Sequence, residues 1–260
     1  MTSPTTTSAQ LVIDLWTVDP SGFDAAAASS CLALLGREER ERHGRFRFPH
    51  LQRDYAIAHA AVRFALSRRA RVHAADWHFA TNEFGRPRVN APVAAIGLSF
   101  NLSHTDGCIA VAVCENAEIG VDVELAVGGE DTLDIAHSHF APPEVDALFA
   151  LPPEERLERF FAYWTLKESY IKGRGMGLSL PLDAFWFDLA GEHPGIGFDA
   201  RIDDDPARWQ FRRLDAGPDH ALALAVASGQ RDFRIVRREL TPRLIAAGAG
   251  TRSSEHSGSN

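Results

Sequence analysis

The sequence predicts a mixed fold of helices and antiparallel strands, and three stretches support this prediction. Residues 54–70 place apolar side chains at helical spacing, as expected for an amphipathic helix. Residues 98–124 contain short strands separated by turns, and residues 153–173 predict a second long helix. Because strands joined by short turns run antiparallel, we expect antiparallel sheets.

The composition argues against several classes of protein. The chain has 260 residues, of which 45% are hydrophobic, enough for one large domain or two smaller ones. No run approaches the roughly 20 apolar residues of a membrane-spanning helix, and the first ten residues do not resemble a secretory signal. The net charge of −8 argues against a dedicated nucleic-acid binder. Three cysteines without metal-binding spacing indicate reduced thiols, so we expect a cytoplasmic protein.

The first third of the chain contains an arginine-rich segment. Residues 11–18 predict a strand, and residues 24–35 predict a helix that ends at Gly36. The arginines that follow alternate with glutamates, which is typical of a solvated helix whose charges pair with one another. As a group, they could instead form a rim that receives an anion. They are Arg37, Arg40, Arg42, Arg45, Arg47 and Arg53.

A short strand at 76–80 is followed by an expected turn at 81–86. Gly85 and Pro87 force the chain to turn around Arg86. A charged residue in such a turn is usually only exposed to solvent, so its position alone does not assign Arg86 a role.

Residues 98–124 carry two candidate metal ligands. We expect strands at 98–104, 108–114 and 119–124, with the last two paired as a hairpin whose apolar first arm is buried. Alternation places Asp122 and Glu124 on one side of the last strand. They lie either on the solvated face of an edge strand or, together with a third carboxylate, in a site for a hard cation such as Mg²⁺.

The second long helix supplies a third carboxylate, Glu168. It falls within an apolar arc of the helix, and Lys172 lies one turn further on. A carboxylate on a core-facing side is costly unless a cation, a metal or several donors meet it. The alternative is an i,i+4 pair of Glu168 with Lys172 on a solvated face. The apolar arc consists of Phe160, Phe161, Trp164 and Ile171.

The rest of the chain predicts a second half. Residues 125–133 have the polarity of a connector, so we expect a domain boundary near residue 125. A short helix is expected at 142–151, and the long helix begins at the proline pair 152–153 and ends at Gly173. Strands are expected at 185–189, 209–214, 220–228 and 233–240, and residues 246–260 are expected to be disordered.

Two motifs together resemble the phosphopantetheinyl transferase superfamily. They are IGVDVE at 119–124 and WTLKESYIKGRGMGLSLPL at 164–182. FGRPRV at 84–89 and FNLSHT at 100–105, in a chain of this length, look like the monomeric surfactin-synthetase-activating subtype of that family. The resemblance covers residues 37–187, and no motif can be carried over to residues 188–260.

The resemblance implies an α+β fold of two subdomains related by a pseudo-twofold axis. Each would be a helix packed on a small antiparallel sheet, with the active site in the cleft between them. Residues 1–125 would bind coenzyme A and supply the first metal carboxylates, and residues 126–245 would supply the helix with Glu168. The protein would act as a monomer.

The resemblance also implies an activity. The enzyme would transfer 4′-phosphopantetheine from coenzyme A to a serine hydroxyl of an apo acyl or peptidyl carrier protein and release adenosine 3′,5′-bisphosphate. The reaction would depend on Mg²⁺, with Mn²⁺ as the alternative. The carriers would belong to nonribosomal peptide, polyketide or fatty acid synthases, and the long subtype usually serves secondary metabolism.

Residue by residue, the resemblance implies three metal ligands, Asp122, Glu124 and Glu168. Glu168 is our expected general base, acting directly or through a metal-bound water. Lys172 assists transfer at the phosphates, and His104 can be an imidazolium beside a phosphate, which raises its pKa. The expected contacts to coenzyme A are Arg42, Thr81, Asn82, Glu83, Phe84, Gly85, Arg86, Ser103, His104 and Lys172.

Two other functions fit parts of the pattern. One is a coenzyme A- or nucleotide-binding protein without catalytic activity, and the other is a different Mg²⁺-dependent phosphotransferase. The chain has neither a P-loop nor a kinase signature. Three carboxylates and Lys172 favour the transferase, since binding alone would not need all four.

Overall fold

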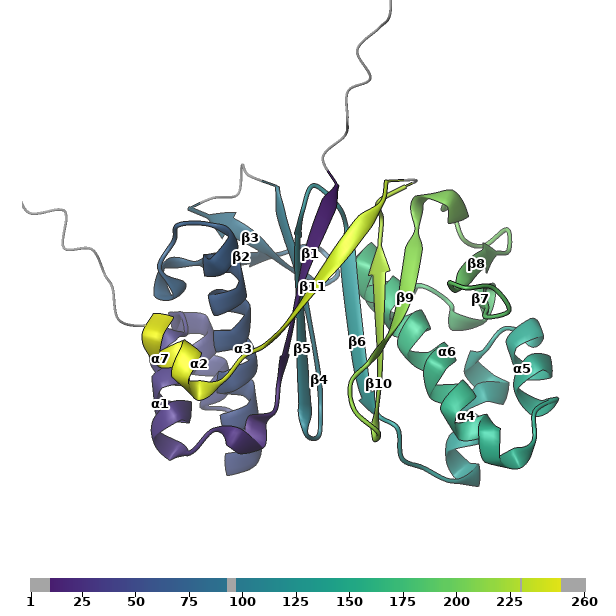
Figure 1. Cartoon of the computed structure of the whole chain (residues 1–260), viewed down its shortest axis with the longest axis horizontal. Helices are drawn as coiled ribbons and strands as arrows, with labels where there is room; N and C mark the ends of the chain where they lie inside the picture. The colour runs from purple at the N-terminus through teal and green to yellow at the C-terminus, as the bar shows by residue number, and fades with distance from the viewer. Residues whose placement is uncertain (1–9, 93–96, 230, 249–260) are drawn as a thin grey trace, which may run out of the picture.

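Two β-sheets form the centre of the computed structural model, and helices cover them on both outer sides (Figure 1). The structure describes residues 10–92, 97–229 and 231–248. The strands are β1 (Leu11–Val18), β2 (His78–Thr81), β3 (Pro87–Ala91), β4 (Leu98–Thr105), β5 (Cys108–Glu115), β6 (Ile119–Leu125), β7 (Phe185–Asp188), β8 (Gly195–Phe198), β9 (Gln210–Asp215), β10 (His220–Val226) and β11 (Phe233–Glu239). The α-helices are α1 (Ala25–Leu34), α2 (Arg37–His43), α3 (Pro49–Arg69), α4 (Glu130–His139), α5 (Pro142–Phe149), α6 (Pro153–Arg174) and α7 (Pro242–Gly248).

Each sheet packs against one long helix, which confirms the α+β class. The first sheet has the strand order β11-β1-β5-β4 and lies against α3, and the second has the order β6-β10-β9 and lies against α6. The first sheet is mixed rather than antiparallel, because β11 runs parallel to β1. None of the helices in the described ranges is both long and apolar enough to cross a membrane.

Three apolar layers hold the elements together. One lies between the first sheet and α1 and α3, one between the two sheets, and one between the second sheet and α6. Strand β5 contributes to two of them: Val111 belongs to the helix side and Ala110 and Ala112 to the side of the other sheet. Burial on both faces explains the uninterrupted apolar run of this strand, as predicted.

The predicted hairpin of 108–114 with 119–124 is wrong. Both edges of β5 are occupied, by β1 and by β4, so β6 pairs instead with β10 in the other sheet. The connection between β5 and β6, in which Asn116 has a φ of 55°, therefore carries the chain from one sheet to the other.

Strands β6 and β4 are joined by side chains instead of a backbone ladder. Buried backbone amides need acceptors, and polar side chains at alternate positions of β4 supply them. The donors and acceptors are Val121 N to Asn101 Oδ1 (2.8 Å), Val123 N to Ser103 Oγ (3.3 Å) and Leu125 N to Thr105 Oγ1 (3.2 Å). The polar residues of the FNLSHT motif therefore link the two sheets.

The expected division at residue 125 does not coincide with the two sheets. Strand β6 precedes that boundary but belongs to the second sheet, while β11 and α7 follow it but pack with β1, α1 and α3. The division into residues 1–125 and 126–245 therefore remains a prediction about domains. Residues 246–248 of the expected tail end α7, and 249–260 lie outside the described residues, as do 1–9.

Several element boundaries differ from those predicted. Helix α3 begins at Pro49, before the predicted 54, because a proline is well tolerated at the first helical position. Helix α4 begins at Glu130, inside the expected connector. Helix α6 begins at Pro153 as predicted but continues past Gly173 to Arg174, and Gly175, with a φ of 67°, ends it.

Strand β6 and helix α6 cross with two glycines in contact. A Cβ on Gly120 would collide with the carbonyl oxygen of Ser169 and would lie 2.5 Å from Gly173 N. A Cβ on Gly173 would lie 2.8 Å from the ring of Trp209. Gly173 therefore serves close approach inside the helix, which is why it does not mark the end of α6.

The glycine contact predicts a large effect of Gly120→Ala on stability. The added methyl group meets backbone atoms that cannot rotate away, so we expect the free energy of unfolding to fall by about 3 kcal/mol or more. Equilibrium urea denaturation measures this change. The matched control is Gly195→Ala in β8, where no atom lies within 4 Å of the added Cβ. Equal unfolding midpoints for the two variants would contradict the assignment.

Candidate active site

Asp122, Lys172 and Ser103 form a hydrogen-bonded group where β4, β6 and α6 meet. Lys172 Nζ donates to Asp122 Oδ1 at 2.5 Å and to Ser103 Oγ at 2.8 Å. The Ser103 hydroxyl donates to the same Asp122 oxygen at 2.9 Å. Asp122 is 1% exposed, so it does not lie on the solvated face of an edge strand.

Lys172 forms its ion pair across the β6–α6 interface. Its partner is Asp122, and among the ion pairs of the described residues none joins Lys172 to Glu168. The alternative of a solvated i,i+4 pair is therefore wrong. Glu168 is instead half-buried and lines a pocket together with Lys172.

One oxygen of the buried aspartate has no partner. Asp122 Oδ2 is buried and makes no hydrogen bond, and a buried carboxylate oxygen in this state is costly. A ligand that supplies positive charge would remove this cost. Asp122 thus offers a free oxygen to a cation, and this is the observation on which the fit of a metal ion rests.

The three carboxylates repel one another. Burial, together with the charges of Asp122 and Glu168, raises the pKa of Glu124 to about 7, although Lys172 and a hydrogen bond from Trp164 act in the opposite direction. Burial and then the charge of Asp122 raise the pKa of Glu168. Burial also raises the pKa of Asp122, against the effects of Lys172 and Ser103.

This donor set fits a hard divalent cation, which prefers carboxylate oxygens and would neutralise the repulsion. Within the described ranges, no three acidic, histidine or cysteine side chains are close enough to hold a metal ion as they stand. The carboxylates would therefore have to approach one another on binding. In this arrangement, the ammonium of Lys172 is the cation that meets Asp122.

The pKa of His104 in the protein without substrate bears on the imidazolium that is predicted beside a phosphate. His104 is exposed, but partial desolvation by neighbouring groups, followed by the charges of Lys172 and His59, lowers its pKa below the ordinary value. The protein's own groups thus favour a neutral imidazole. The predicted imidazolium would require an anion, such as a substrate phosphate, beside the ring.

The arginine-rich segment contains both paired and unpaired cations. Arg37 pairs with Glu41 (3.8 Å) and Arg53 with Asp54 (2.9 Å), as expected for a solvated, self-paired segment. Arg42 is exposed at the end of α2, lies 6.0 Å from the centroid of the Tyr55 ring and makes no ion pair within the described residues.

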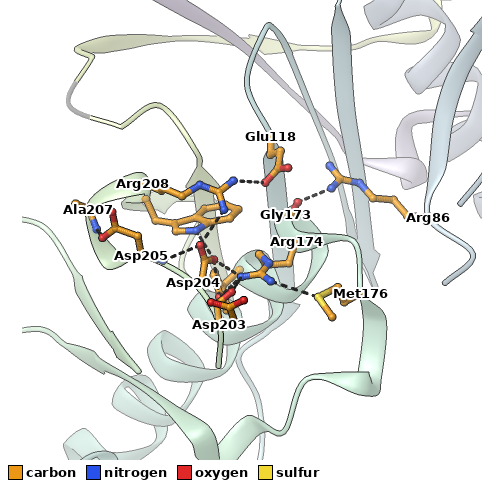
Figure 2. A network of polar contacts seen from close by, with 12 residues as sticks. Arg86, Glu118, Gly173, Arg174, Met176, Asp203, Asp204, Asp205, Ala207 and Arg208 are labelled. Carbon is orange, nitrogen blue, oxygen red and sulfur yellow. Dashed lines mark hydrogen bonds and ion pairs between the residues drawn. The ribbon is translucent and has the colours of Figure 1, made fainter. Parts of the chain in front are cut away.

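The turn between β2 and β3 contacts the end of α6. Asn82 Oδ1 accepts hydrogen bonds from the amides of Phe84 (3.0 Å) and Arg86 (2.8 Å), which shape the turn. Asn82 Nδ2 donates to Gly175 O at 2.8 Å. The guanidinium of Arg86 donates to Gly173 O, as Figure 2 shows, and to Ile119 O at 2.9 Å.

A pocket of about 300 Å³ lies between this turn and α6. It brings three predicted turn residues together with Glu168 and Lys172. Of the other predicted contacts, Arg42, Thr81, Asn82, Glu83, Ser103 and His104 do not line it. The lining residues are Phe84, Gly85, Arg86, Pro87, Asn101, Leu102, Glu168, Ile171, Lys172, Gly175 and Gly177.

A buried ion pair beside Glu168 was missed in the sequence. Lys167 is 1% exposed, pairs with Glu144 at 2.6 Å and donates to Leu182 O (2.8 Å) and Phe185 O (2.6 Å). These contacts fix the rotation of α6 and therefore the side to which Glu168 points. The available signal was a lysine within the mainly apolar segment 160–171 of the helix.

The chain is similar to known proteins over most of its length. The family model described as the 4′-phosphopantetheinyl transferase superfamily matches residues 118–226, which include β6 and α6. The chain is 32% identical to a 4′-phosphopantetheinyl transferase of Bacillus subtilis over 206 residues, 79% of this chain and 88% of that protein. It is 30% identical to 4′-phosphopantetheinyl transferase HetI of Nostoc sp. (83% and 87%) and 28% identical to 4′-phosphopantetheinyl transferase Sfp of Bacillus subtilis (75% and 84%).

The raised pKa of Glu124 predicts a pH dependence of stability. Above its ordinary pKa of 4.5 the unfolded chain has lost this proton, whereas the folded chain keeps it up to about pH 7. The free energy of unfolding without metal should therefore fall as the pH rises from 4.5 to about 7. Glu124→Gln should make this fall smaller, because glutamine does not ionise, while the raised pKa values of Asp122 and Glu168 still contribute to it.

Urea denaturation in a chelator across this pH range tests the prediction. The control is Glu155→Gln, which changes an exposed carboxylate in the first turn of α6. Parallel stability curves for wild type and Glu124→Gln would show that Glu124 has an ordinary pKa.

Proposed function

Because the chain belongs to the 4′-phosphopantetheinyl transferase superfamily and is therefore an enzyme, we propose that it transfers 4′-phosphopantetheine from coenzyme A to a serine hydroxyl of an apo carrier protein. One observation carries this proposal: Lys172 contacts Asp122 beside the pocket that Glu168 lines. Asp122 also keeps a buried oxygen without a hydrogen-bond partner. Phosphoryl transfer depends on positioning and on positive charge at the phosphate oxygens, which these groups can supply.

We propose that Asp122, Glu124 and Glu168 hold Mg²⁺, with Mn²⁺ as the alternative. When bound, such an ion supplies Lewis-acid stabilisation of the pyrophosphate oxygens. The free oxygen of Asp122 and the raised pKa values of Glu124 and Glu168 support this assignment, since a cation would relieve the repulsion among them.

Lys172 and Glu168 take the two other tasks. The ammonium of Lys172 sits on a flexible stem and can share its donors between Asp122 and a substrate phosphate. Glu168 accepts the proton of the carrier serine, whose oxygen bonds to the phosphorus that carries pantetheine. The bond from this phosphorus to the bridging oxygen breaks, and adenosine 3′,5′-bisphosphate leaves.

The remaining predicted residues are proposed to bind coenzyme A. Arg42 is exposed and makes no ion pair with any residue that the structure describes, which suits the 3′-phosphate, and residues 84–86 of the turn form one wall of the pocket. A phosphate beside His104 would make it an imidazolium. The Ser103 hydroxyl already uses its donor on Asp122 and both acceptor positions on Lys172 and Val123, so a phosphate contact would displace one of these bonds.

We further propose that the enzyme acts as a monomer in the cytoplasm. Its carriers would be domains of nonribosomal peptide, polyketide or fatty acid synthases. The test is to incubate the protein with coenzyme A, Mg²⁺ and an apo carrier protein and to weigh the carrier. A gain of one phosphopantetheine group supports the proposal. No gain with any carrier would favour a protein that binds coenzyme A without catalysis or acts on another phosphate ester.

Glu168→Gln tests the general base. Because a positioned base contributes roughly a hundredfold to ten-thousandfold, we expect kcat to fall by about that factor. Coenzyme A binding without metal should persist, as measured by calorimetry. Glu155→Gln on the same helix is the control, and turnover like that of wild type in Glu168→Gln would exclude the assignment.

Arg42→Ala tests the contact to the 3′-phosphate. Loss of a charge-assisted hydrogen bond should raise the KM for coenzyme A by about tenfold and leave kcat nearly unchanged. Steady-state kinetics with varied coenzyme A measure both. Arg45→Ala, which removes a neighbouring exposed arginine, should leave KM unchanged. An unchanged KM in Arg42→Ala would show that Arg42 does not contact coenzyme A and is only a solvated surface residue.

A further inference from the structure

We propose that Arg86 is a positioning residue, which holds the end of α6 against the start of β6, and that its guanidinium does not bind the 3′-phosphate of coenzyme A. Testing this role by measuring turnover rests on the proposed function, because it requires the transfer of phosphopantetheine. The role itself follows from the contacts of the described residues.

The guanidinium of Arg86 ties together the two elements that carry Asp122 and Lys172. It donates to Gly173 O, directly after Lys172, and to Ile119 O, three residues before Asp122. These two carbonyls flank the crossing of β6 and α6 at the glycine contact. One side chain from the β2–β3 turn therefore clamps this crossing.

The charge of Arg86 is compensated without a phosphate. The last carbonyls of a helix lack partners within it and carry the negative end of the helix dipole. Arg86 caps one of them, at Gly173, and Asn82 caps another, at Gly175 (2.8 Å). Arg86 is partly buried, and this burial lowers its pKa.

The end of α6 is shaped to receive this side chain. A Cβ on Gly175 would lie 2.5 Å from Cδ and 3.0 Å from Nη1 of Arg86. Glycine at this position therefore serves both the left-handed backbone, with a φ of 67°, and the passage of the arginine. A side chain reaching outward to a ligand would not need this space.

The opposite side of the same helix end is held by a separate network. Arg174 pairs with Asp204, whose side chain is fully buried, and Arg208 bridges Asp204 (2.9 Å) to Glu118 (3.2 Å), as Figure 2 shows. All of these residues lie within or next to the second sheet. Arg86 is the arginine that reaches the end of α6 from the β2–β3 turn.

Loss of Arg86 should therefore affect the chemical step. Without the clamp, the last turn of α6 can shift, and Lys172 loses its fixed distance to Asp122. A displacement of about 1 Å can cost a hundredfold in rate, so we expect kcat of Arg86→Ala to fall by roughly tenfold to a hundredfold. The preference for coenzyme A over 3′-dephospho-coenzyme A should stay within about twofold of wild type, because the 3′-phosphate is not a partner of Arg86.

The experiment measures kcat and KM with coenzyme A and with 3′-dephospho-coenzyme A. The four variants are Arg86→Ala, Arg86→Lys, Arg42→Ala and Arg156→Ala. Arg86→Lys keeps a cation that can reach one carbonyl and should recover part of kcat. Arg42→Ala should reduce the preference for coenzyme A. Arg156→Ala is the matched control: Arg156 also donates to two carbonyls, of Leu151 (2.9 Å) and Phe149 (3.0 Å), but at the other end of α6. It should lower thermal stability and leave kcat unchanged.

Two results would overturn the proposal. One is a preference for coenzyme A that collapses in Arg86→Ala, and the other is an unchanged kcat. If the wild-type protein transfers nothing to any carrier, the proposed function fails, and hydrogen exchange still decides the role of Arg86. Faster exchange of the amides at 119–123 and 171–175 in Arg86→Ala but not in Arg156→Ala supports the clamp, and equal exchange rejects it.

Discussion

The close crossing of β6 and α6 is the contact on which the candidate site depends. Without side chains at Gly120 and Gly173, the two backbones approach closely enough for Lys172 to reach Asp122. The orientation of the helix is then fixed at several points along its length by the Lys167–Glu144 pair, by Arg174 with Asp204 and by Arg86. Packing sets the distance between the two elements, and the buried polar contacts set the rotation and register of the helix. Because such contacts are costly when one partner is missing, they specify one arrangement of α6.

The site itself opposes folding. Asp122 has a buried oxygen without a partner, and the pKa values of Glu124 and Glu168 are raised by burial and by mutual repulsion. The surrounding structure offsets this cost with three apolar layers, two of which share β5. Carboxylates with perturbed pKa values of this kind are typical of functional sites. Positive charge beside Asp122, Glu124 and Glu168 would relieve this repulsion.

The two halves of the chain exchange elements. Strand β6 leaves the first half to join the second sheet, and β11 returns from the second half to join the first. Asn101, Ser103 and Thr105 link the sheets at the edge strands β4 and β6, and Ser103 also reaches Asp122 and Lys172. The polar motif at 100–105 is thus explained by its position between two sheets. Ser103, Asp122 and Lys172 therefore lie together where β4 of the first sheet contacts β6 of the second.

Features that depend on residues close together in the chain could be predicted from the sequence. Helical spacing and the proline pair identified α6, the apolar run identified the buried β5, and alternation placed Asp122 and Glu124 on one side of their strand. The combination of motifs identified the family. Four other features became apparent only in the fold: β6 pairs with β10 instead of β5, β11 crosses to the first sheet, Lys172 contacts Asp122 instead of Glu168, and Arg86 caps α6. Local periodicity sets which side of an element is buried, but any strand edge or helix end can satisfy the same backbone groups, so the choice of partner is made by packing between distant parts of the chain.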